Sequence, residues 1–67
     1  MKAYRILVHD LREREPVELA AELAHDARAH EVARERLSSS SYFAAVEVWR
    51  GAVKLCHLVK PEYRVAA

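Results

Sequence analysis

Apolar and polar residues alternate most clearly between Tyr42 and Val59, and this alternation predicts a β-hairpin. The turn falls at Arg50-Gly51, where Gly51 is the only glycine in the chain. Glycine tolerates the positive φ that tight hairpin turns require. We therefore predict two antiparallel strands over residues 42–50 and 53–60.

The register of this hairpin predicts two different faces. A two-residue turn at Arg50-Gly51 places Trp49 opposite Ala52 and Glu47 opposite Lys54. Because successive side chains point to opposite faces of a strand, the remaining residues divide into two sets. The face toward the core contains Val46, Val48, Val53, Leu55 and Val59. The outer face contains Phe43, Ala45, Glu47, Trp49, Ala52, Lys54, Cys56 and Leu58.

The chain before the hairpin predicts one strand and one helix. Residues 3–9 alternate as a half-buried strand, with Tyr4, Ile6 and Val8 pointing inward. Pro16 suits the first turn of a helix. The following stretch is rich in Ala, Leu, Glu and Arg and contains neither Gly nor Pro, so we predict a helix over residues 16–37.

The breaks after the helix and after the hairpin are marked by serine and proline. Four serines at 38–41 end the predicted helix, because serine competes for backbone hydrogen bonds. Pro61 ends the last strand, because proline cannot donate a hydrogen bond to a sheet. Residues 61–67 form a tail in which Tyr63 and Val65 can add a short edge strand.

Apolar residues lie on two faces of the predicted helix. The first half presents Leu19, Ala20, Leu23, Ala24 and Ala27, and the second half presents Ala29, Val32, Ala33 and Leu37 on roughly the opposite face. Three explanations are open: an irregular turn near 28–30, a short strand over 16–20 with the helix starting near Glu22, or a partner on the second face. We favour a continuous helix whose Ala29, Val32 and Leu37 contact a second protomer or another partner.

These elements predict an α+β fold with the order β-α-β-β in a single domain, residues 1–67. A helix that crosses the sheet makes the first strand parallel to the second strand and antiparallel to the third. The prediction is thus a three-stranded antiparallel sheet with residues 53–59 at its centre. The helix covers one face of this sheet.

The charge balance and the cysteine content of the chain argue against several classes of protein. The chain has eleven Lys and Arg and ten Asp and Glu, which are interspersed in the sequence and give a net charge of +1. This balance argues against a nucleic-acid mimic and against direct nucleic-acid binding. A lone cysteine, Cys56, suits a reducing cytoplasm, and no apolar run approaches the ~20 residues of a membrane-spanning helix.

The sequence contains no recognisable catalytic or metal-binding motif. His25 and His30 are five residues apart and cannot ligate one ion from the same helix face. In the predicted register His9 lies on the outer face and His57 on the inner face. Cys56 has no fixed base beside it. We therefore predict no catalytic residues, no metal site, no cofactor and no enzymatic activity.

The outer face of the predicted sheet is the best candidate for a binding surface, because aromatic and Arg residues ringed by charge are typical of protein interfaces. The predicted partner-binding residues are Arg5, Leu7, Phe43, Glu47, Trp49, Lys54 and Leu58. An alternative is that Phe43 and Trp49 stack on nucleic-acid bases.

The opening Met1-Lys2-Ala3-Tyr4, the strand Met1–Val8, the Ala-rich helix and the later strand Val46-Glu47-Val48 resemble the layout of small phage anti-CRISPR proteins that act on type I CRISPR-Cas systems. The resemblance implies an inhibitor in the cytoplasm of a bacterial host. Such an inhibitor binds Cascade or a Cas subunit and blocks target DNA binding or nuclease recruitment. The alternatives are a small dimeric nucleic-acid-binding regulator and an uncharacterised bacterial interaction domain.

Overall fold

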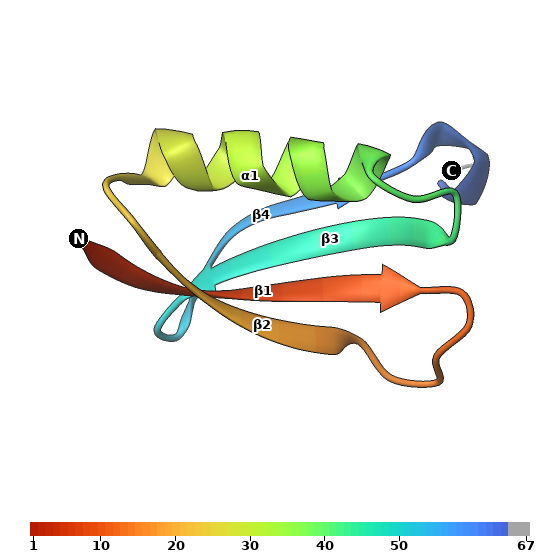
Figure 1. Cartoon of the computed structure of the whole chain (residues 1–67), viewed down its shortest axis with the longest axis horizontal. Helices are drawn as coiled ribbons and strands as arrows, with labels where there is room; N and C mark the ends of the chain where they lie inside the picture. The colour runs from red at the N-terminus through yellow and green to blue at the C-terminus, as the bar shows by residue number, and fades with distance from the viewer. Residues whose placement is uncertain (65–67) are drawn as a thin grey trace.

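Four β-strands, one α-helix and one turn of 3-10 helix make up the protein. Their order is β1 (Lys2–Asp10), β2 (Val17–Leu23), α1 (Asp26–Ser38), β3 (Phe43–Arg50), β4 (Val53–Val59) and η1 (Pro61–Tyr63). This computed structural model describes residues 1–64. The strands form one sheet in the order β2-β1-β3-β4, and every neighbouring pair is antiparallel. Helix α1 lies along one face of the sheet (Figure 1).

The predicted three-stranded β-α-β-β fold is wrong, because residues 17–23 form a strand rather than the first half of a helix. In β2 the half-buried side chains are Leu19, Ala21 and Leu23, and the residues between them are exposed. This period of two is that of a strand. The strand that we left as an alternative is thus present, but it is longer than residues 16–20, and the helix begins at Asp26.

The additional strand also changes which strands are neighbours. Because β2 reverses the chain once more, β3 runs antiparallel to β1 and pairs with it directly. The predicted central strand, 53–59, is therefore at the edge of the sheet, where β4 pairs with β3 alone among the described strands. Strand β2 forms the other edge.

Helix α1 begins where a side chain caps it. The Nδ1 atom of His25 accepts a hydrogen bond from the backbone N–H of Arg28 at 3.1 Å, which satisfies one of the free donors at a helix N-terminus. The helix packs on the sheet through Ala29 and Ala33, which are fully buried. Their spacing of four residues puts them on one face, and their small side chains allow a close approach.

The residues predicted as an oligomer contact lie on this sheet-facing side of α1. Ala29 is fully buried, and Val32 and Leu37 are half-buried and packed against the core. The second apolar face that suggested a protomer contact arose from reading β2 as helix. With β2 paired to β1, the helix has a single apolar face and the sheet covers it.

The predicted hairpin register is also wrong. The turn residues are Gly51 and Ala52, with Arg50 opposite Val53, and Gly51 has a φ of 60°. After the pair Trp49 and Lys54, a bulge in β4 shifts the register. As a result Val48 is opposite Cys56, Glu47 is opposite His57 and Val46 is opposite Leu58.

These shifts change the faces of several side chains. Cys56 and Leu58 lie on the helix side of the sheet and pack against the core, whereas Val59, predicted inside, is opposite Ala45 on the other face. Val53, also predicted inside, lies beside the turn and is exposed. A second irregularity, between His9 and Asp10, pairs Phe43 with Asp10. Phe43 consequently packs against the core as well.

The core is built from β1, β3 and α1. Tyr4, Ile6 and Val8 are each 2% exposed, and Val46 and Val48 are fully buried. The inward set predicted for β1 is therefore correct. Among residues 1–64, no helix is long and apolar enough to cross a membrane. Tyr63 lies in η1 rather than in a strand, and Val65 is outside the described residues.

Candidate functional site

The sheet face opposite α1, here called the outer face, gathers side chains from all four strands. Its members alternate along each strand with the residues of the core. They include Arg5, Leu7 and His9 of β1, Glu18 of β2, Ala45, Glu47 and Trp49 of β3, and Lys54, His57 and Val59 of β4.

Trp49 lies between two cations on this face. Arg5 and Lys54 are its direct neighbours on β1 and β4. The Arg5 guanidinium carbon is 5.8 Å and the Lys54 Nζ is 5.5 Å from a ring centroid of the indole. Both distances allow a cation–π attraction. Arg5 also forms an ion pair with Glu18, with 3.2 Å between its Nη1 atom and the Glu18 Oε1 atom.

Glu47 makes polar contacts with three neighbouring side chains on this face. Its Oε1 accepts a hydrogen bond from the indole N–H of Trp49 at 3.2 Å and forms an ion pair with the Lys54 Nζ at 3.5 Å. Its Oε2 is 2.6 Å from the Nε2 atom of His9. Because an ionised carboxylate can only accept, the imidazole donates this hydrogen bond.

Only 13% of the Glu47 side chain is exposed, and its surroundings keep it ionised. Burial is the largest single influence and opposes ionisation. The hydrogen bonds from His9 and Trp49, together with the charge of Lys54, outweigh it and hold the pKa of the Glu47 carboxyl below its usual range.

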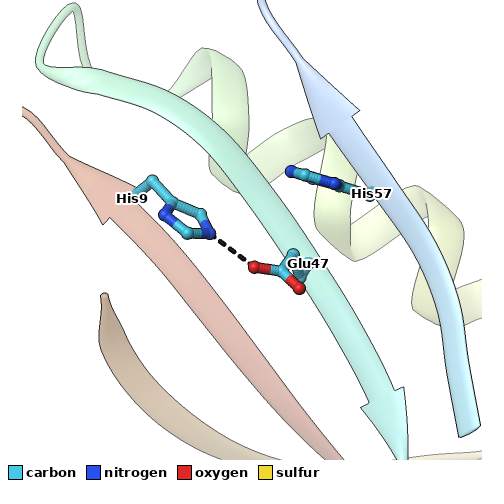
Figure 2. Close-up of side chains that lie close together, drawn as sticks. All are labelled: His9, Glu47 and His57. Carbon is cyan, nitrogen blue, oxygen red and sulfur yellow. Dashed lines mark hydrogen bonds and ion pairs between the residues drawn. The ribbon is translucent and has the colours of Figure 1, made fainter. Parts of the chain in front are cut away.

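His57 joins His9 and Glu47 on the outer face (Figure 2). The three side chains come from the adjacent strands β1, β3 and β4, and the His9 and His57 ring centroids are 6.0 Å apart. The prediction that His57 lies on the inner face is wrong. The bulge in β4 adds a residue between Lys54 and Cys56, and this reverses the facing of every later residue in the strand.

The structure brings together most of the predicted partner-binding residues, but not all of them. Arg5, Leu7, Glu47, Trp49 and Lys54 share the outer face. Phe43 and Leu58 do not, because both pack against the core. Of the two aromatic side chains predicted for the outer face, Phe43 and Trp49, only Trp49 lies there.

Sequence reasoning did not find the grouping of His9 with Glu47 and His57. The two histidines are far apart in the chain, and their spacing matches no metal motif. Only the strand order β1-β3-β4 and the bulge bring them together. The signal available in the sequence was the position of His9 in the outward set of β1.

Cys56 lies on the other side of the sheet, opposite Val48 and half-buried. Burial raises the pKa of the Cys56 thiol, outweighing a backbone hydrogen bond from Val48. The reactive thiolate is therefore a minor species at neutral pH.

No protein-family model matches the chain, and neither a curated protein nor a solved structure matches it.

Proposed function

We propose that this protein is a non-enzymatic protein-binding module that acts through the outer face, with Trp49 as its anchor. The observation that carries the proposal is the position of Trp49, half-buried between Arg5 and Lys54 on the sheet face that α1 leaves uncovered. Tryptophan and arginine are the residues most enriched among interface hot spots. A side chain already held by its neighbours also loses little conformational freedom on binding.

The charge pattern of the outer face favours a protein partner over a nucleic acid. Arg5 and Lys54 are balanced by Glu18 and Glu47, which form ion pairs with them. Carboxylates at these positions repel phosphates, whose neutralisation provides most of nucleic-acid affinity. The alternative of base stacking is also weakened, because Phe43 packs against the core and only Trp49, of the two predicted stacking residues, stays on the outer face.

The resemblance to small type I anti-CRISPR proteins identifies the first partner to test, a subunit of Cascade or another Cas protein. In this proposal the protein acts in the bacterial cytoplasm as a stoichiometric inhibitor. It covers a surface that the complex needs for target DNA binding or nuclease recruitment. Catalysis has no part in it, and the raised pKa of the Cys56 thiol supports this.

The test is a binding titration of purified type I Cascade with the wild-type chain and with Trp49→Ala. A hot-spot tryptophan contributes at least about 2 kcal/mol, so affinity should fall at least ~30-fold. Tyr63→Ala is the matched control, because Tyr63 is an exposed aromatic residue in η1, outside the outer face. This variant should bind like the wild type.

Two results contradict the proposal at different levels. Equal affinity of wild type and Trp49→Ala for Cascade shows that the outer face is not the binding surface. A wild-type chain that binds no subunit of Cascade, and no Cas nuclease recruited to it, excludes the anti-CRISPR function.

A further inference from the structure

We propose that His9, Glu47 and His57 form a binding site for one divalent transition-metal ion, for which Zn²⁺ is the best fit. This inference does not depend on the proposed function. It arises from the place where the strand register puts two imidazoles and a carboxylate, on three adjacent strands of the same face (Figure 2).

The distances suit a single ion. Each of the three side chains offers one ligand atom, and these atoms all lie within 4.8 Å of one another. Zinc binds histidine nitrogen and carboxylate oxygen at about 2.0–2.2 Å in tetrahedral geometry, so two ligand atoms of one ion are about 3.3–3.6 Å apart. A small rotation of His57, which is exposed, brings its nitrogen into this range.

The backbone explains why these side chains converge. Glu47 and His57 are directly opposite each other on β3 and β4. His9 is opposite Ala45, two residues from Glu47, which makes His9 and Glu47 diagonal neighbours. The small side chain of Ala45 leaves room for the His9 ring to lean toward the carboxylate, as the 2.6 Å contact between His9 Nε2 and Glu47 Oε2 requires.

Contacts with neighbouring side chains fix the orientation in which the Glu47 carboxylate can bind a metal ion. Trp49 and Lys54 both contact Oε1, which leaves Oε2 directed toward His9. Hydrogen bonds and ion pairs to a ligand side chain, like these, orient the ligand and change the affinity of the site for the metal. A metal ion would replace the hydrogen bond between His9 and Glu47. The His9 imidazole would then carry its proton on Nδ1.

Two imidazoles and one carboxylate are a ligand set that zinc uses when one coordination position stays open. Here that position faces solvent, because His57 lies at the exposed end of the group. Glu47 supplies a single negative charge, and Lys54 is paired with it. A dication at this site keeps a net positive charge, so an anionic fourth ligand is favoured.

A hydrogen-bonded pair of His9 and Glu47 would account for two of the three residues without a metal. It does not require His57, whereas a metal site does. His57 is therefore the residue whose substitution separates the two explanations. Because its side chain is exposed, His57→Asn leaves the core intact.

The experiment is a calorimetric titration of the full chain, without a histidine tag and stripped of metal, with ZnCl₂. We expect one zinc ion per chain and at least about tenfold weaker binding in His57→Asn. Substitution of a residue that only hydrogen-bonds to a ligand already lowers metal affinity ~10–100-fold. Substitution with Co²⁺ should give the visible absorption of a four-coordinate site without a thiolate charge-transfer band.

Two variants serve as matched controls. His30→Asn removes a histidine from α1, and Cys56→Ser removes the only thiol, which lies on the helix side of the sheet. Both should bind zinc like the wild type. Circular dichroism of every variant verifies that it is folded.

The proposal is overturned if the wild type binds no zinc, or if folded His57→Asn binds zinc as tightly as the wild type. It is equally overturned if His30→Asn or Cys56→Ser abolishes binding, because the ion then lies elsewhere. Unchanged zinc binding in His9→Asn would also contradict it.

Discussion

Glu47 and His57 lie directly opposite each other on β3 and β4, although the predicted turn at Arg50-Gly51 would pair Glu47 with Lys54. The displaced Lys54 is instead opposite Trp49, and it reaches Glu47 along the same face with 3.5 Å between Nζ and Oε1. The turn at Gly51-Ala52 places Lys54 beside Trp49, and the extra residue in β4 places His57 beside Glu47. The outer face therefore carries two neighbouring groups. One is Trp49 with its cations, and the other is Glu47 with two histidines.

Truncation of the core should destabilise the protein strongly. Ile6 of β1 is 2% exposed and belongs to the core, so Ile6→Ala should lower the free energy of unfolding by ~2–5 kcal/mol. Urea unfolding followed by the fluorescence of Trp49 measures the change. Leu11→Ala is the control, because Leu11 is 55% exposed and its truncation should cost within about 0.5 kcal/mol. Equal losses in the two variants would contradict this core.

A matched pair of glutamates tests whether residues 17–23 are a strand. Glu22 is exposed in β2 and Glu35 is exposed in α1. Threonine is favoured in strands and disfavoured in helices, and each propensity changes stability by up to ~0.7–1 kcal/mol. Glu22→Thr should therefore leave the free energy of unfolding unchanged or raise it, and Glu35→Thr should lower it. A loss in Glu22→Thr as large as that in Glu35→Thr would indicate helix at position 22.

Asp26 connects the start of α1 to the sheet and should make stability depend on pH. Its carboxylate accepts a hydrogen bond from the Tyr4 hydroxyl at 2.7 Å and pairs with Arg50. The Tyr4 hydrogen bond, followed by that of Arg50, holds the pKa of Asp26 below its usual range.

Because the folded-state pKa of Asp26 is lowered, its stabilising contribution is present above the unfolded pKa of about 3.9 and is lost as the pH falls through the folded value. Asp26→Asn should be less stable than the wild type at neutral pH, and the difference should shrink in acid. Urea midpoints across this range measure it, with the exposed Glu13→Gln as the control. A difference that does not change with pH would refute the assignment.

The turn of the hairpin depends on the conformation of Gly51. Its φ of 60° is in the left-handed region, and no atom lies within 4 Å of the position that a Cβ would occupy. Gly51→Ala should therefore cost ~1–2 kcal/mol through backbone strain alone. Gly51→Asn should cost less, because Asn tolerates this region. Thermal unfolding compares the two, and the reverse order would show that strain is not the cause.

Local patterns in the chain were sufficient to predict several parts of the structure. The alternation of Tyr4, Ile6 and Val8 identified β1 and its inward face. The single glycine located the hairpin, and the prediction placed Arg5, Glu47, Trp49 and Lys54 on the outer face. Each of these follows from the period of a strand or from the backbone freedom of one residue.

The remaining features, strand β2 and the strand register, depend on contacts between residues far apart in the chain. Residues 17–23 have the composition of a helix, but pairing with β1 and burial of Leu19 and Leu23 stabilise a strand there. The bulges that place Phe43 and Leu58 on the helix side of the sheet cannot be recognised from amino-acid composition, because they depend on the register between neighbouring strands. The grouping of His9 with His57 depends on the same alignment, and it therefore could not be read from the chain alone.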